Sequence, residues 1–155
     1  TEMASLKPIL LVEDNPNDIE LTLAALEAGQ LANEIVICRD GAEALDYVFR
    51  RGPHEARQAQ DPAAILLDLK LPKVDGLEVL ASVKGDPQTR GIPIVMLTSS
   101  REETDVVKSY DLGVNAFVVK PVAFDEFFAA IKEIGVFWAL LNEPPPHRGG
   151  WPSNV

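Results

Sequence analysis

Four short runs of aliphatic residues constrain the fold more than any other feature of this chain, because each run ends in a polar or charged side chain. The runs cover residues 9–12, 65–67, 94–97 and 117–119, and they lead into Glu13 and Asp14, Asp68, Thr98 and Lys120, respectively. Continuous apolar runs of this length are typical of parallel strands buried on both faces. In open α/β sheets, ligands bind at the carboxyl ends of the strands, where the strand order reverses. The pattern therefore predicts one pocket in which these residues converge.

Segments typical of strands and helices alternate along most of the chain, as in βα units. Five strands are expected. The first covers residues 8–13, the second covers residues 35–38, the third ends at residue 68, the fourth starts at residue 93, and the fifth covers residues 116–119. Five helices are expected. The first runs from residues 15–17 to 29, the second begins near residue 40, the third covers residues 75–84, the fourth covers residues 102–112, and the fifth begins near residue 124. The second helix is expected to bury Ala42, Leu45, Val48 and Phe49. We therefore expect an α/β fold, a five-stranded parallel sheet doubly wound by five helices, with a surface loop over residues 50–62.

Length, charge and composition narrow the class of protein and partner. The chain has 155 residues, which suits one domain, expected over residues 7–142 and followed by a tail rich in Pro and Gly over residues 143–155. A net charge of -10 argues against nucleic acid as the main partner. The sequence has neither an apolar run of about 20 residues, as a membrane span needs, nor the pattern of a secretory signal, so a cytoplasmic protein without a membrane partner is expected. The single cysteine, Cys38, lies in an apolar segment and is expected to be a reduced core thiol.

The polar residues at the predicted strand ends suit phosphoryl chemistry. An ionised aspartate can accept a phosphoryl group, and Asp68 is the candidate acceptor. Carboxylates repel the incoming group, so a hard divalent cation is needed, and Glu13 and Asp14 could bind it. Lys120 would pair with the phosphoryl oxygens, and the Thr98 hydroxyl would hydrogen-bond to them. The simpler alternative is that the acids cap the helices that follow the strands.

Taken together, these motifs resemble the receiver domain of two-component response regulators. The matching segments are residues 12–15, 67–76, 97–99 and 120–121, in the family's order and spacing, over roughly residues 7–140. The resemblance implies a flavodoxin-like strand order 2-1-3-4-5 and phosphorylation of Asp68 by the phosphohistidine of a sensor histidine kinase. It also implies a Mg²⁺ or Mn²⁺ site completed by the backbone carbonyl of Lys70. Phe117 occupies the family's aromatic switch position and would act with Thr98 through packing alone, because it has no hydroxyl.

A narrower resemblance is to single-domain regulators paired with phytochrome-type sensor kinases. It is based on Asn15-Pro16-Asn17-Asp18, the extended loop after the second helix, and residues 137–146. The resemblance implies a stand-alone signalling protein, not an enzyme with a substrate of its own, that assists its own phosphorylation and dephosphorylation.

Two other classes of function remain possible at this stage. One is a receiver fold kept only for binding, against which the intact set of pocket residues argues. The other is a phosphatase with an aspartate nucleophile, which would carry a second aspartate at position 70, where this chain has Lys70.

The last predicted helix carries more apolar residues than one stripe against a sheet can bury. A homodimer built on this helix, the fourth helix and the fifth strand would cover the apolar surface that the sheet leaves exposed. The residues expected on the dimer face are Val106, Tyr110, Phe127, Ile134, Phe137, Trp138 and Leu141. The alternative is that the tail folds back over Trp138 and Leu141 within one chain.

Overall fold

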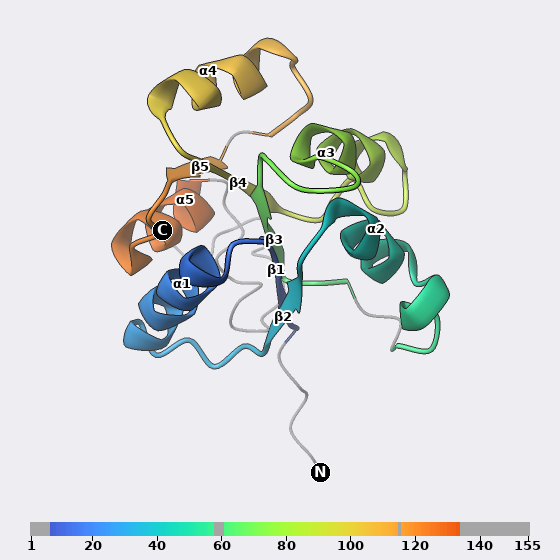
Figure 1. Ribbon diagram of the computed structural model, residues 1–155, viewed down its shortest axis with the longest axis horizontal. Coiled ribbons are helices and arrows are strands. Elements are labelled where there is room, and N and C mark those ends of the chain that lie inside the picture. The colour runs from blue at the N-terminus through green and yellow to red at the C-terminus, as the bar shows by residue number, and fades with distance from the viewer. Residues whose placement is uncertain (1–6, 58–60, 115, 134–155) are drawn as a thin grey trace, which may run out of the picture.

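The computed structural model describes residues 7–57, 61–114 and 116–133, which form a five-stranded parallel sheet with helices on both faces (Figure 1). The strand order is β2-β1-β3-β4-β5, as the resemblance to receiver domains implied. The strands are β1 Ile9–Val12, β2 Ile35–Cys38, β3 Ala64–Asp68, β4 Ile94–Thr98 and β5 Ala116–Val119. Every residue of the three central strands is buried, whereas the edge strands β2 and β5 are partly exposed. This burial explains why the central strands are continuous apolar runs in the sequence.

Each strand is followed along the chain by a helix. They are α1 Pro16–Ala28, α2 Gly41–Phe49, α3 Gly76–Gly85, α4 Arg101–Ser109 and α5 Phe124–Glu133, and a short 3-10 helix, η1 Gly52–His54, lies in the loop predicted over residues 50–62. Four helices have an N-cap side chain that accepts a hydrogen bond from a backbone N–H three residues later; the caps are Asn15, Asp40, Asp75 and Ser100. Such caps satisfy donors left free in the first turn, and here they fix the turns that border the pocket.

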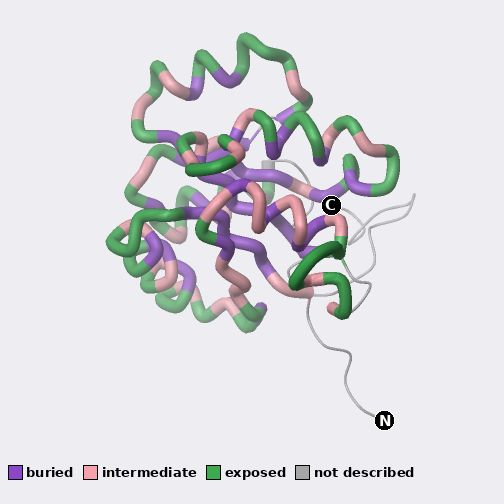
Figure 2. Tube along the Cα trace, turned by 45° about the vertical axis from the view of Figure 1, so that its right-hand side comes forward, coloured by how far each residue is buried: buried purple, intermediate pink, exposed green. Residues whose placement is uncertain are grey.

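The sheet separates two apolar layers. Figure 2 shows the buried residues gathered along the central strands. Helices α1 and α5 cover one face, where Leu11, Leu66 and Phe127 are fully buried. Helices α2, α3 and α4 cover the other face, where Leu67 and Met96 are fully buried. No helix in the described part of the chain is long and apolar enough to span a bilayer.

Two sequence predictions about packing are wrong in detail. Phe127 was expected on an exposed dimer face but lies in the core with 0% exposure, because the first turns of α5 direct it towards the sheet. The buried face of α2 consists of Gly41, Ala44, Tyr47 and Val48, whereas Ala42, Leu45 and Phe49 are half-buried.

The face that α2 turns towards the core is set by the close approach of its first turn to the loop before α3. A β-carbon at Gly41 would overlap the backbone carbonyl oxygen of Val74. The helix is therefore oriented with Gly41 inwards, and Ala44 and Val48 share that face at helical spacing. Helix α4 also ends at Ser109, earlier than the predicted residue 112.

Candidate functional site

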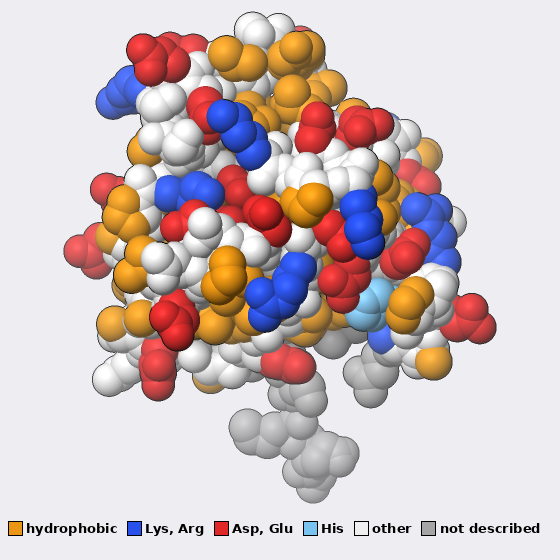
Figure 3. Space-filling view, in the orientation of Figure 1, with side chains coloured by type: hydrophobic (Ala, Val, Ile, Leu, Met, Phe, Trp, Pro, Cys, Tyr) orange, Lys and Arg blue, Asp and Glu red, His pale blue; other side chains and the backbone are white. Residues whose placement is uncertain are grey.

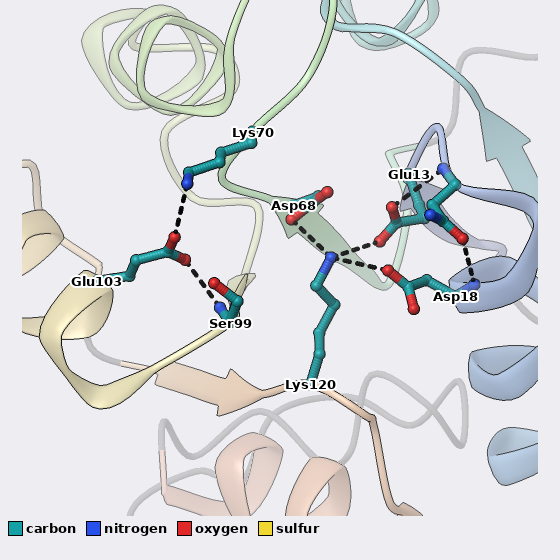
Figure 4. A network of polar contacts seen from close by, with 8 residues as sticks. Glu13, Asp18, Asp68, Lys70, Ser99, Glu103 and Lys120 are labelled. Atoms are coloured by element: carbon teal, nitrogen blue, oxygen red, sulfur yellow. Dashed lines mark hydrogen bonds and ion pairs between the residues drawn. The ribbon is translucent and has the colours of Figure 1, made fainter.

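The pocket lies at the carboxyl edge of the sheet, where Glu13 follows β1, Asp68 ends β3 and Lys120 follows β5. The Lys120 ammonium lies among three carboxylates (Figure 4). Its Nζ is 3.2 Å from Asp68 Oδ1, 3.1 Å from Asp18 Oδ2 and 3.4 Å from Glu13 Oε1. Lys120 is thus held against the candidate acceptor, as the sequence predicted.

Glu13, Asp14 and Asp68 form a cluster with the composition of a hard-metal site. One carboxylate oxygen from each lies within 4.8 Å of the others. Glu13 and Asp68 are buried, whereas Asp14 is exposed and leaves the cluster open to solvent on its side. Carboxylate oxygens with room for water are the ligands that Mg²⁺ and Mn²⁺ accept. These three residues therefore fit a divalent ion.

Burial and the repulsion between carboxylates set the electrostatics of the pocket. Burial, followed by the charge of Asp68, raises the pKa of Glu13 to about 7, although Lys120 opposes the shift. Burial also raises the pKa of Asp68, against the opposing effect of Lys120. Burial alone would lower the pKa of Lys120, but Asp68, Asp18 and Glu13 outweigh it and raise that pKa. A charged lysine is thus available, and a divalent cation would relieve the remaining repulsion. In the view of Figure 3, acidic side chains lie beside lysine or arginine side chains in the middle of this face.

Thr98 is buried at the end of β4, and its hydroxyl contacts α4. Its Oγ1 is 2.9 Å from Thr104 Oγ1, and the Thr104 hydroxyl lies 3.4 Å from the Ser100 carbonyl oxygen, to which it donates. A hydroxyl group placed between a pocket and a helix can respond to a new acceptor on the pocket side.

A second link joins the loop after β3 to α4 (Figure 4). The Lys70 ammonium lies 3.1 Å from Glu103 Oε2, and Glu103 Oε1 accepts a hydrogen bond from the Ser99 backbone N–H at 2.8 Å. That backbone hydrogen bond, with help from Lys70, lowers the pKa of Glu103. The Lys70 side chain therefore points towards α4, and the role predicted for its backbone carbonyl in metal binding stays a prediction.

Besides Thr98, the predicted switch and dimer residues within the described part of the chain lie on β5, on α4 or just after it, and on α5. Phe117 is half-buried against the core, with Lys108 Nζ 5.4 Å from its ring centroid. Val106 and Tyr110 are 50% and 58% exposed. Phe127 does not belong to this surface, as its burial shows. Four further predicted dimer residues lie outside the described residues: Ile134, Phe137, Trp138 and Leu141.

Asp18 is a pocket residue to which the sequence analysis gave no role. It lies in the first turn of α1, where its backbone N–H donates to the Asn15 cap at 3.0 Å. The Asn15 cap fixes the first turn of α1, and the Asp18 carboxylate in that turn lies beside Lys120. The sequence indicated the helix start at Asn15, but the spacing alone does not give the direction in which α1 leaves β1, on which the contact of Asp18 with Lys120 depends.

Comparison with known proteins agrees with this geometry. The family model of the response regulator receiver domain matches residues 9–132, a span that contains every pocket residue described above. The chain belongs to the response regulator receiver domain family. Its fold is the flavodoxin-like receiver fold, and it functions as a receiver-domain response regulator, a signalling protein.

The similar proteins include phytochrome response regulators. Response regulator Rcp1 of Synechocystis sp. (strain PCC 6803) is 41% identical over 132 residues, which cover 85% of this chain and 88% of Rcp1. The bacteriophytochrome response regulator AtBRR is 68% identical with a TM-score of 0.85, over 90% of this chain and 100% of AtBRR. The phosphorylated cyanobacterial phytochrome response regulator RcpA is 43% identical with a TM-score of 0.70, over 92% of this chain and 100% of RcpA. A Mn²⁺-bound structure of Rcp1 is 40% identical with a TM-score of 0.68, over 91% of this chain and 99% of that chain.

Proposed function

We propose that this receiver accepts a phosphoryl group on Asp68 from a phosphohistidine of a sensor histidine kinase. The observation that carries the proposal is the position of the Asp68 carboxylate, 3.2 Å from Lys120 and within a cluster of three acids. In the transfer, a carboxylate oxygen of Asp68 forms a bond to phosphorus while the bond between phosphorus and the donor imidazole breaks. The imidazole leaves as a neutral ring after taking a proton from solvent.

The surrounding residues supply the charge that this transfer needs. Glu13, Asp14, Asp68 and the backbone carbonyl of Lys70 would hold Mg²⁺ or Mn²⁺, and the ion would neutralise charge on the phosphoryl oxygens. Lys120 would exchange part of its contact with Asp68 for a phosphoryl oxygen. The same residues would assist hydrolysis of the aspartyl phosphate, so the protein would speed both its phosphorylation and its dephosphorylation without acting on another substrate.

Phosphorylation would change the surface around α4 and β5. The Thr98 hydroxyl would leave Thr104 and donate to a phosphoryl oxygen, and Phe117 would repack as the loop moves. This mechanism resembles other switches in which a local charge event shifts an element between two positions.

The kinase partner is proposed to be of the phytochrome type. Support comes from AtBRR and RcpA, which are described as phytochrome response regulators and share 68% and 43% of their aligned residues with this chain. A homodimer is proposed to form on the face that exposes Val106, Tyr110 and Val119. We also propose a receiver domain over residues 7–142, a tail over 143–155 and a cytoplasmic location, with neither nucleic acid nor membrane as a direct partner; the net charge of -10 supports the exclusion of nucleic acid.

The acceptor is tested by phosphorylating the intact chain with acetyl phosphate and Mg²⁺ and locating acid-labile phosphate by mass spectrometry. One phosphoryl group is expected on Asp68, and Asp68→Asn should abolish labelling because an amide is not an ionised nucleophile. The control Asp61→Asn changes an exposed acid just before β3 and should label normally. Labelling of another residue in the parent chain would contradict the assignment, and no labelling at all would favour a module kept only for binding.

A further inference from the structure

A second cluster of potential metal ligands lies outside the phosphoacceptor pocket and contains the chain's only cysteine. Cys38 ends β2, Glu43 lies in the first turn of α2, and His54 ends η1. The Cys38 sulfur, a Glu43 carboxylate oxygen and a His54 ring nitrogen all lie within 4.8 Å of one another. These three groups have no part in the phosphoryl chemistry proposed above.

The distances already approach those of a metal centre. His54 Nε2 lies 3.5 Å from Glu43 Oε2. In a tetrahedral zinc site with bonds of about 2.1 Å, a nitrogen and an oxygen ligand lie about 3.4 Å apart. Small side-chain rotations would therefore bring the three donor atoms around one ion.

The cluster is accessible on one side and closed on the other. The Glu43 and His54 side chains are 39% and 23% exposed, whereas Cys38 is fully buried beneath them. In Figure 3 the histidine surface, in pale blue, has acidic side chains beside it. An ion could thus enter between the carboxylate and the imidazole and reach the sulfur last.

Two of the three ligands are held by neighbours. Glu43 Oε1 accepts a hydrogen bond from the Arg39 backbone N–H at 3.2 Å, which leaves Oε2 directed at His54. The His54 ring packs edge-on against Tyr47, with centroids 5.2 Å apart and an angle of 72° between the ring planes. Contacts that orient ligands in this way reduce the entropy lost when a metal binds.

The local charge also suits a cation. Burial raises the pKa of the Cys38 thiol to about 12, with smaller contributions from Glu43, Asp40 and Asp46, so the thiol is protonated without a metal. Asp40 and Asp46 each have a basic partner, Lys73 at 3.5 Å and Arg51 at 3.2 Å, so their influence is partly offset. A thiolate and a carboxylate together balance a divalent ion.

We propose that Cys38, Glu43 and His54 form a binding site for a divalent transition metal of the zinc class. Sulfur, imidazole nitrogen and carboxylate oxygen are all zinc ligands, and a water molecule would take the fourth position. On binding, a metal–sulfur bond forms and the thiol proton is released to solvent. The oxygen-only cluster of Glu13, Asp14 and Asp68 suits Mg²⁺ instead, so the two sites would select different ions.

The test is titration of the intact, metal-free chain with Zn²⁺ and with Co²⁺ in the presence of excess Mg²⁺, which occupies the phosphoacceptor pocket. We expect one equivalent of Zn²⁺ to bind by calorimetry, and Co²⁺ to produce the near-ultraviolet charge-transfer band of a thiolate ligand. Cys38→Ser should remove that band. His54→Gln and Glu43→Gln should each weaken Zn²⁺ binding by at least about tenfold, since even outer-shell substitutions cost that much.

Matched controls separate this site from other ligands. Glu55→Gln changes an exposed acid next to His54, and His147→Gln removes the chain's other histidine; both should leave the affinity unchanged. His54→Gln and Glu43→Gln alter partly exposed side chains, so they test the site even if Cys38→Ser fails to fold. The proposal is overturned if Co²⁺ gives no thiolate band in the parent chain. It is also overturned if excess Mg²⁺ displaces the Zn²⁺, or if Zn²⁺ binds His54→Gln with the parental affinity.

Discussion

The phosphoacceptor pocket and the surface formed by α4 and β5 are built in opposite ways. In the pocket, Glu13 and Asp68 are 0% and 5% exposed, and both contact Lys120. On the surface, Val106 of α4 and Tyr110, which follows the helix, are half-exposed or more, and α4 buries only Thr104 and Val107 among its residues. The pocket is fixed by central strands, whereas α4 has few buried contacts to keep it in one position. The difference suggests that chemistry is located in the rigid region and the response in the loosely packed one.

Two polar contacts connect these regions. Thr98 at the end of β4 bonds to Thr104, and Lys70 after β3 pairs with Glu103. Both contacts run from the pocket loops to the first turn of α4, so a charge added at Asp68 has a direct route to that helix.

The largest expected effect is on the free energy of unfolding, and it distinguishes a buried residue of α5 from an exposed residue of α4. Phe127→Ala should lower the free energy of unfolding by about 3–5 kcal/mol, because it removes a fully buried ring and leaves a cavity. At a protein concentration low enough for the parent to be monomeric, Val106→Lys should change that free energy by less than about 0.5 kcal/mol, because it alters an exposed helical position. Denaturant unfolding gives both values.

Light scattering on the same Val106→Lys protein tests the proposed dimer. A charged side chain in an apolar contact should reduce the mass from twice 16.9 kDa to that of one chain. A parent chain that is monomeric at micromolar concentration would contradict the dimer. In the unfolding experiment, an equal loss of stability in Phe127→Ala and Val106→Lys would contradict the distinction between a buried residue of α5 and an exposed residue of α4.

A smaller effect concerns the pH dependence of stability in the metal-free protein. Glu13 has its ordinary pKa of 4.5 in the unfolded chain and a pKa of about 7 in the fold. Between these values the folded state binds more protons, so stability should fall as pH rises from 4.5 to 7, by up to about 3 kcal/mol. Glu13→Gln should remove this part of the slope, and Mg²⁺ should restore stability to the parent at pH 7. An identical slope in parent and variant would show that Glu13 is not protonated in the pocket.

The smallest effect concerns Asp18, which is 29% exposed in its contact with Lys120. Asp18 raises the pKa of Lys120, so Asp18→Asn should lower it, by less than about one unit because the pair is partly screened. Nuclear magnetic resonance of labelled lysine measures this pKa. The matched variant Glu20→Gln, which alters an exposed acid in the same helix, should leave it unchanged. No difference between the two variants would remove Asp18 from the pocket.

The sequence predicted the strands and the strand-end residues well because both follow from local patterns. Apolar runs mark the buried strands, and a parallel sheet brings their carboxyl ends to one edge, so Asp68 and Lys120 could be placed together before the structure was known. Asp18 was missed because its contact depends on how α1 leaves β1, which the Asn15 cap determines. The orientation of Phe127 and the buried face of α2 depend on packing between helices and loops, such as the contact of Gly41 with Val74, and no local pattern encodes these.

In the proposed mechanism, the charge state of the pocket controls the surface around α4. The most direct test compares amide resonances of the intact chain, in Mg²⁺, before and after addition of beryllofluoride, which mimics the phosphoryl group on an aspartate. We predict shifts at Asp68 and Thr98 that continue through Thr104 and Val106 of α4 and reach Phe117 on β5. Shifts confined to the residues next to Asp68, with α4 and Phe117 unchanged, would contradict the account.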